Sequence, residues 1–224
     1  MKVLIVAAHP DDEVLGAGGS IARHISQGDQ VTVVILGGGL TSRYTDPAQV
    51  APEQLQQLQA DAQQAARIMG VEDLRLFDLP DNRFDSVDLL DIVKLTEGVI
   101  EEVQPETIYT HFYADLNIDH QLTARAVLTA CRPLAESPVR RLLAFEVPSS
   151  TGWGFPEQPF MPTVFVDISA TLQQKLAAMA IYDSEIREFP HPRSEQSLRV
   201  RAESWGSQAG MPAAEPFMLI RERL

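Results

Sequence analysis

The chain has 224 residues, of which 45% are hydrophobic, so it is long enough to bury one sizeable core. Charged residues make up 22% of it, a balance that excludes the disordered and fibrous classes and predicts a single domain over residues 1–224. The formal net charge of -13 disfavours nucleic acid and anionic membranes as partners, because both carry negative charge.

The first part of the chain predicts a strand, a helix and a second strand. Residues 2–8 form a continuous apolar run rich in β-branched side chains, which is typical of a parallel strand buried on both faces. A helix over residues 16–27 is expected to end at Gly28, and residues 30–38 form a second buried strand. Together these segments predict a βαβ unit.

The alternation of strands and helices continues to residue 147. Further helices are predicted over residues 53–70, 88–103, 121–132 and 170–182, and further strands over residues 74–79, 106–112, 140–147 and 164–168. This order favours an α/β, Rossmann-like fold with a mostly parallel sheet and helices on both faces, in which ligands bind at the carboxyl ends of the strands. The part from residue 150 onward is a candidate lid or substrate-specificity extension.

The N-terminal apolar run passes directly into charged residues. It is shorter than the apolar core of a signal peptide or a membrane span. Cys131 is the only cysteine, so no intrachain disulfide can form. We therefore expect a cytoplasmic protein with no membrane partner.

An imidazole and three carboxylates follow the first predicted strand. His9 and Pro10 precede Asp11, Asp12 and Glu13. Adjacent acids repel one another, and a divalent cation or the amides of a helix N-terminus would offset this repulsion. Imidazole and carboxylate ligands suit zinc and also iron, manganese or cobalt, and a catalytic site of this kind usually has three protein ligands and a water. A further ligand must come from elsewhere in the chain.

A second group of candidate ligands follows the strand predicted over residues 106–112. Its members are His111, Asp115, Asn117, Asp119 and His120, in the segment THFYADLNIDH. Two strand ends of a parallel sheet can meet over one ion. The alternative is that the first group merely begins a helix and the second is a solvated loop. The presence of both groups at strand ends, with the Gly-rich turn GAGG beside the first, favours a metal site.

The segments AAHPDDEVLGAGG and D-x-N-x-DH resemble the motifs of the PIG-L or LmbE-like family of N-acetylglucosaminyl-type deacetylases. The resemblance spans most of the chain, and its first motif is the more specific one. It implies a Rossmann-like fold and one zinc ion held by His9, Asp12 and His120. It also implies that Asp11 is the general base, which takes a proton from a water whose pKa the metal lowers to roughly 7. The implied reaction converts an N-acetyl amino sugar, or its conjugate, to acetate and a free amine.

One position departs from the family pattern. Several relatives carry His-Pro-Asp-His in the second motif, and their first His helps to stabilise the oxyanion or to protonate the amine, whereas this chain has Asn117 there. Asn117 can donate a hydrogen bond but cannot supply a proton. We therefore expect Asp11 to act as base and then as acid, with His191 as the alternative acid. Asp119 is expected either to orient an imidazole or a donor, or to cap the helix.

Four side chains are candidates for contacts to the substrate. They are Arg43, Asn82, His111 and His191. Arg43 follows the second strand, where a guanidinium can bind sugar hydroxyls or a phosphate, and the resemblance supports this role. Asn82 lies in another loop after a strand, where turn formation is the alternative, and His111 either touches substrate or closes its strand. Arg187, His191 and Arg193 lie in the tail segment REFPHPRS, a candidate lid or anion contact.

Two alternatives to a sugar deacetylase stay open. A metal-dependent amidase or esterase acting on a non-sugar substrate would use the same residues. A non-catalytic nucleotide-binding module would use the Gly-rich turn, but GAGG lacks the G-x-G-x-x-G spacing and the acids of HPDDE would repel a pyrophosphate. We expect a zinc-dependent N-deacetylase of a small amino-sugar substrate, and a homo-oligomer by analogy with relatives.

Overall fold

The computed structural model describes residues 1–224, apart from the side chain of residue 47. The strands are β1 (Lys2–Ala7), β2 (Gln30–Gly37), β3 (Asp73–Leu79), β4 (Thr107–His111), β5 (Arg141–Phe145), β6 (Val164–Asp167) and β7 (Ala214–Glu222). The α-helices are α1 (Asp12–Ser26), α2 (Pro52–Met69), α3 (Leu89–Val103), α4 (Ile118–Ala130), α5 (Leu172–Met179) and α6 (Glu195–Ala209). Short 3₁₀ turns cover Thr41–Arg43, Pro47–Gln49, Phe84–Ser86 and Thr151–Trp153.

The strands form one seven-stranded sheet in the order β3-β2-β1-β4-β5-β7-β6. The strands β1 to β5 pair in parallel, whereas β7 is antiparallel to both β5 and β6. The predicted mostly parallel α/β sheet is therefore confirmed. The chain runs outward from β1 to β3 and then returns to place β4 on the other side of β1, which creates a crevice at the carboxyl ends of β1 and β4.

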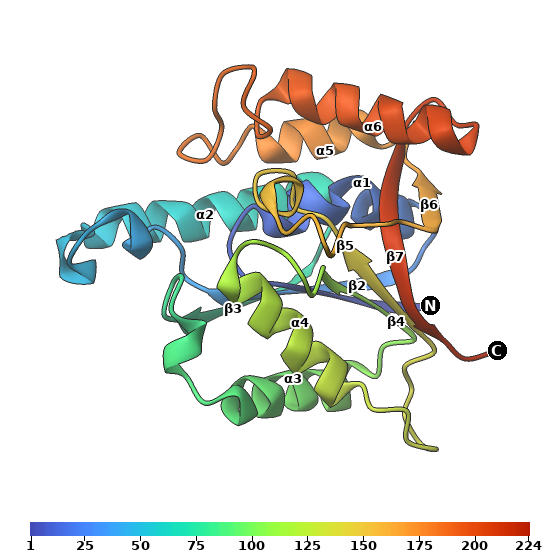
Figure 1. The fold of residues 1–224 in the computed structure, drawn as a ribbon, viewed down its shortest axis with the longest axis horizontal. Coiled ribbons are helices and arrows are strands. Elements are labelled where there is room, and N and C mark those ends of the chain that lie inside the picture. The colour runs from blue at the N-terminus through green and yellow to red at the C-terminus, as the bar shows by residue number, and fades with distance from the viewer.

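Helices cover both faces of the sheet (Figure 1). The helices α1, α2, α5 and α6 lie on one face, drawn above the sheet, and α3 and α4 lie on the other. In β1, Val3 and Ile5 contribute to the core under the first group of helices, and Leu4 and Val6 to the core under the second. This strand is buried on both faces, as its unbroken apolar run predicts. Judged by length and hydropathy, no helix within the described part of the chain qualifies as a membrane span.

The glycines of the GAGG turn lie inside α1, because this helix begins at Asp12 and not at residue 16 as predicted. A Cβ on Gly16 would lie 2.2 Å from the ring of Phe145, and a Cβ on Gly19 would lie 2.8 Å from Ile168. These residues therefore let α1 pack closely against the sheet. The close packing brings the first turn of α1, which carries Asp12, to the crevice.

The sequence analysis missed α6 and β7. In α6 the buried residues Leu198, Ala202 and Gly206 lie four positions apart on one face, but two of the three are small, so the sequence shows only a weak apolar stripe. In β7 the proline Pro216 argues against a strand inside a sheet. It pairs with Phe165 of the edge strand β6, and the pairing of β7 with β5 begins only at the next residue, Phe217. The last third of the chain therefore extends the sheet with an antiparallel strand that local patterns do not reveal.

A buried ion pair connects α5 and β7 to α1. Lys175 Nζ donates to Glu215 Oε1 at 2.6 Å and to the carbonyl oxygen of Leu15 at 2.8 Å. Glu215 also accepts the backbone N–H groups of Gly19 and Ser20 at 2.9 and 2.7 Å. Both charged side chains are buried. The pair is favourable here because its hydrogen-bonding groups are occupied and each charge has its partner.

We expect Lys175→Met to lower the free energy of unfolding by about 3–5 kcal/mol, because it leaves the buried Glu215 carboxylate without a counter-charge. Urea denaturation measures this change. The double variant Lys175→Met/Glu215→Gln should recover part of the loss, since it buries no unpaired charge. A single variant as stable as the wild type would show that the pair does not support the fold.

Candidate active site

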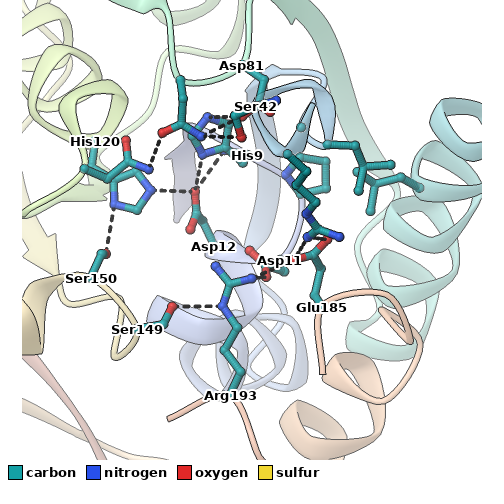
Figure 2. A pocket seen from close by; sticks show the side chains of 17 residues that line it. His9, Asp11, Asp12, Ser42, Asp81, His120, Ser149, Ser150, Glu185 and Arg193 are labelled. Atoms are coloured by element: carbon teal, nitrogen blue, oxygen red, sulfur yellow. Dashed lines mark hydrogen bonds and ion pairs between the residues drawn. The ribbon is translucent and has the colours of Figure 1, made fainter. Parts of the chain in front are cut away.

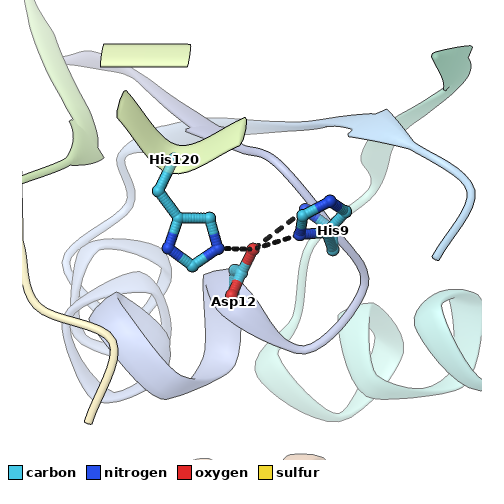
Figure 3. Close-up of side chains that lie close together, drawn as sticks. All are labelled: His9, Asp12 and His120. Atoms are coloured by element: carbon cyan, nitrogen blue, oxygen red, sulfur yellow. Dashed lines mark hydrogen bonds and ion pairs between the residues drawn. The ribbon is translucent and has the colours of Figure 1, made fainter. Parts of the chain in front are cut away.

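The two motif segments meet at the carboxyl edge of the sheet. His9 follows β1, Asp12 begins α1 and His120 lies in the first turn of α4. Asp12 Oδ2 lies 3.5 Å from His9 Nδ1 and 3.2 Å from His120 Nε2 (Figure 3). One ligand atom from each of the three residues lies within 4.8 Å of the others. The structure thus brings together the side chains that the sequence analysis expects to bind a metal.

The donor set and its spacing fit one divalent ion. Ligand atoms about 2.1 Å from a tetrahedral zinc ion stand about 3.4 Å apart, which is close to the contacts around Asp12. Burial lowers the pKa of His9, but Asp119 and Asp12 outweigh it and raise that pKa to about 10. Burial likewise lowers the pKa of His120, and the carboxylates of Asp12 and Asp115 raise it to about 9. The carboxylates therefore favour a positive charge at this position, and a divalent ion can supply that charge.

Each of the two imidazoles contacts a buried carboxylate through its far nitrogen. His9 Nε2 lies 2.9 Å from Asp119 Oδ2, and His120 Nδ1 lies 3.1 Å from Asp115 Oδ1. Asp119 is itself held by the backbone N–H of Phe84, which donates to its Oδ1 at 2.9 Å. Carboxylates in this position orient metal-ligating imidazoles and raise their basicity. The three side chains could therefore hold a metal ion, and each of the two imidazoles has a carboxylate at its other nitrogen.

We expect Asp115→Asn to weaken zinc binding by roughly 10–100-fold, because the amide orients His120 less firmly and removes a negative charge. Competition with a chromogenic chelator measures the affinity. Asp29→Asn is a matched control, because Asp29 contacts His24 Nδ1 at 2.7 Å in a similar pair outside the cavity lining. If both substitutions changed the zinc affinity equally, Asp115 would have no specific role in metal binding.

Asn117 is the N-cap of α4, which begins at Ile118 and not at residue 121. Its Oδ1 accepts the N–H of Asp119 at 2.8 Å, and its Nδ2 donates to Asn82 Oδ1 at 2.9 Å. The alternative that Asp119 caps this helix is therefore wrong. Both polar atoms of the Asn117 side chain are engaged by the protein.

His111 lies beneath the site and not in the cavity. It is 1% exposed, its Nε2 accepts the backbone N–H of Ala8 at 2.8 Å, and its ring stacks on that of His120. Burial holds the pKa of His111 well below its ordinary value, so the ring is neutral. With Nε2 occupied and the ring covered, His111 supports His120 and does not make the substrate contact expected from the sequence.

Asp11 stands between the three candidate metal ligands and the C-terminal part of the chain. Its φ angle of 97° is unusual for a residue other than glycine, and its N–H donates to Glu13 Oε2 at 3.0 Å. Its carboxylate is buried, with Oδ2 2.9 Å from Arg193 Nη1. Burial raises the pKa of Asp11 well above its usual range, and Arg193 opposes this rise. A cation at Asp12 would act in the same direction as Arg193 and favour the carboxylate form.

A cavity of about 280 Å³ opens over these groups (Figure 2). Beyond the three candidate metal ligands and Asp11, the lining includes Arg43, Asp81, Asn82, Asn117, Glu185 and Arg193. Arg43 and Asn82 thus lie at the cavity, as expected. His191 does not line it, and its Nδ1 accepts the backbone N–H of Arg193 at 3.1 Å. The side chain that reaches the cavity from this segment is Arg193.

Asp81 and Glu185 are cavity residues that the sequence analysis missed. Asp81 is 4% exposed, and its Oδ1 lies 3.4 Å from His9 Nε2. Its place two residues after the strand predicted over residues 74–79 was the signal that could have identified it. Glu185 binds both Arg43 and Arg193, with Oε2 2.6 Å from Arg193 Nη1. It follows a helix in an irregular segment, where no local pattern marks it.

Comparison with known proteins finds one family model, described as PIG-L: GlcNAc-PI de-N-acetylase, which matches residues 4–131. A similar curated protein is the probable N-acetyl-alpha-D-glucosaminyl L-malate deacetylase 2 of Bacillus cereus. It is 30% identical over 192 residues, which cover 82% of this chain and 83% of that protein.

Solved structures with the same fold include proteins of different activity. The N,N'-diacetylchitobiose deacetylase of Pyrococcus horikoshii has a TM-score of 0.78 at 20% identity, over 98% of this chain and 84% of that chain. The 4-carboxy-2-hydroxymuconate hydratase of Pseudomonas putida KT2440 has a TM-score of 0.77 at 23% identity, over 100% and 97%. Such distant likenesses show the fold alone, and the function has to be argued from the site.

Proposed function

This chain belongs to the PIG-L family, and from that membership we propose that it is a metal-dependent N-deacetylase of N-acetylglucosamine-type conjugates. One observation carries the proposal: Asp12 Oδ2 lies within 3.5 Å of a nitrogen of both His9 and His120, beside a cavity that Asp11 also lines. The name of the Bacillus cereus relative, which aligns over about four fifths of both chains, supports a deacetylase.

His9, Asp12 and His120 would hold the ion, for which we propose zinc. Two imidazoles and one carboxylate, each imidazole backed by a second carboxylate, suit this metal and its first-row neighbours. When bound, the ion increases the acidity of a water and polarises the acyl carbonyl.

Asp11 performs both proton transfers in the proposed reaction. Its carboxylate takes a proton from the attacking water as the water oxygen bonds to the acyl carbon and the carbonyl electron pair moves to the acyl oxygen. Asp11 then returns this proton to the amide nitrogen as the C–N bond breaks, which releases acetate and the free amine. Asn117 cannot supply a proton, and His191 lies outside the cavity lining. We therefore assign the role of general acid to Asp11.

Arg43 and Asn82 are the proposed contacts to the sugar. Both line the cavity together with Asp81 and Asn117, so its wall presents hydrogen-bond donors and acceptors. Such a wall suits the hydroxyl groups of a sugar ring better than it suits an apolar acyl chain.

Acetate release tests the proposal. Metal-loaded protein should release acetate from N-acetylglucosamine, its glycosides or N,N'-diacetylchitobiose, and not from an acetyl-lysine peptide. Removal of the metal by a chelator should abolish the activity, and added zinc should restore it. Release from the peptide alone would make the protein an amidase of another class, and full activity after metal removal would contradict the metal-dependent mechanism.

A further inference from the structure

We propose that Arg193 binds the negative charge that develops on the acyl oxygen during hydrolysis. This role rests on the proposed deacetylase function and adds to it a catalytic group from the segment between α5 and α6. The guanidinium is held in place by its neighbours, and one of its nitrogens has no hydrogen-bond partner among the residues that the structure describes. Asn117, at the position that departs from the family pattern, already donates to Asn82.

Three contacts hold the guanidinium in place. Arg193 Nη1 lies 2.9 Å from Asp11 Oδ2 and 2.6 Å from Glu185 Oε2, and Nε donates to Ser149 Oγ at 2.8 Å. These partners come from the start of α1, the loop after α5 and the loop after β5. The side chain is only 23% exposed. A group held from three directions can stabilise charge without first reorganising.

The remaining nitrogen, Nη2, is the donor available to a substrate. The hydrogen bonds of Arg193 with the described residues use its backbone N–H, Nε and Nη1, and none of them uses Nη2. Figure 2 shows the guanidinium beside Asp11 with one nitrogen directed toward Asp12, where the acyl group would react. Asp11 raises the pKa of Arg193, so the group stays charged. A charged donor in such a site stabilises an oxyanion strongly.

Two other side chains that could donate to the acyl oxygen, Asn117 and Arg43, are less well placed. Asn117, which replaces the His of several relatives, donates from Nδ2 to Asn82 Oδ1 at 2.9 Å and carries no charge to oppose that of an oxyanion. Arg43 binds Glu185 through Nη2 at 2.5 Å and makes no ion pair with Asp11 or Asp12 among the described residues. Arg43 is thus separated from the reacting groups by Glu185, whereas Arg193 contacts the proposed base directly. Arg193 is therefore the donor best placed for the acyl oxygen.

The proposed step balances without a further reactant. As the water oxygen bonds to the acyl carbon, its proton passes to Asp11 and the carbonyl electron pair moves to the acyl oxygen, which Nη2–H of Arg193 then binds. When the C–N bond breaks, the electron pair returns to form the acetate carbonyl, and Asp11 gives its proton to the nitrogen. Arg193 donates a hydrogen bond throughout and loses no proton. One guanidinium thus aligns the base and neutralises the intermediate.

The test compares Arg193→Gln and Arg193→Lys with the wild type in acetate release and in ligand binding. We expect kcat of Arg193→Gln to fall by roughly 10²–10³-fold with unchanged KM and metal content, and Arg193→Lys to recover part of the loss. A phosphonamidate analogue of the acetamido sugar, whose anionic tetrahedral centre resembles the intermediate, should bind Arg193→Gln more weakly by a similar factor in calorimetry. Free glucosamine should bind both proteins equally.

Arg187→Gln is the matched control, because Arg187 lies in the same segment but is not a lining residue of the cavity, and it donates to the carbonyl oxygens of Ser184 and Ile186. Its kcat and analogue affinity should equal those of the wild type. An active wild type whose Arg193→Gln variant keeps its kcat, or loses analogue and glucosamine affinity equally, would overturn this role alone. A wild type that releases no acetate from any acetamido sugar would overturn the proposed function as well.

Discussion

Replacing Asp11 by asparagine should lower kcat for acetate release by roughly 10²–10⁴-fold while the protein keeps its metal. The amide has nearly the shape of the carboxylate but cannot take a proton from water. Asparagine also tolerates a positive φ better than most residues, so the backbone at 97° need not change. Asp11 is not one of the three proposed ligands, and the substitution leaves the side chains of His9, Asp12 and His120 unchanged.

Acetate assays at saturating substrate, elemental analysis and thermal unfolding together test the Asp11→Asn variant. Asp11→Ala is the comparison, because it removes the same carboxylate but puts a residue that disfavours positive φ into the turn before α1. We expect equal loss of kcat in both variants and a lower melting temperature for Asp11→Ala alone. An Asp11→Asn enzyme that turns over at the wild-type rate would eliminate Asp11 as the general base.

His120→Ala should lose most of the bound metal and, with it, the deacetylase activity. The substitution leaves two of three protein ligands, and Asp12 loses a neighbour 3.2 Å away. Since the metal supplies both water activation and carbonyl polarisation, we expect a loss of kcat at least as large as that in Asp11→Asn. The two variants differ in metal content, which separates a ligand from a base.

Elemental analysis of the purified proteins should find one metal ion per wild-type chain and much less in His120→Ala. His24→Ala is the matched control, because His24 lies in the last part of α1 and contacts Asp29 and Tyr109 instead of the cavity. It should keep both metal and activity. Wild-type metal content in His120→Ala would mean that the ion, if any, is held elsewhere.

Much of the fold could be predicted because its first strands and helices carry strong local patterns. The run at β1 is buried on both faces, and each βα repeat has its own helix and its own stop signal. The placement of His9 and His120 also followed, since residues after parallel strands share one edge of the sheet. Where local signals were weak, as in α6 and around Pro216 in β7, the prediction failed.

Both interpretations of the first motif contain part of the answer. Asp12 and Glu13 do form the acidic first turn of α1, as the simpler alternative held. The same turn directs Asp12 toward His9 and His120, as the metal-site interpretation requires. A helix N-terminus and a metal site are compatible because the backbone amides and the ion both favour negative charge at this point.

The sequence by itself determined the α/β class, the strand-end positions of the candidate ligands and the family. Only the tertiary structure decided that Asp119 backs His9 while Asp115 backs His120, that His111 is covered, and that Arg193 reaches the cavity. The physical reason is the distance along the sequence over which each kind of interaction acts. Periodicity and capping act over a few neighbouring residues, whereas the direction of a side chain is set by packing between segments a hundred or more residues apart.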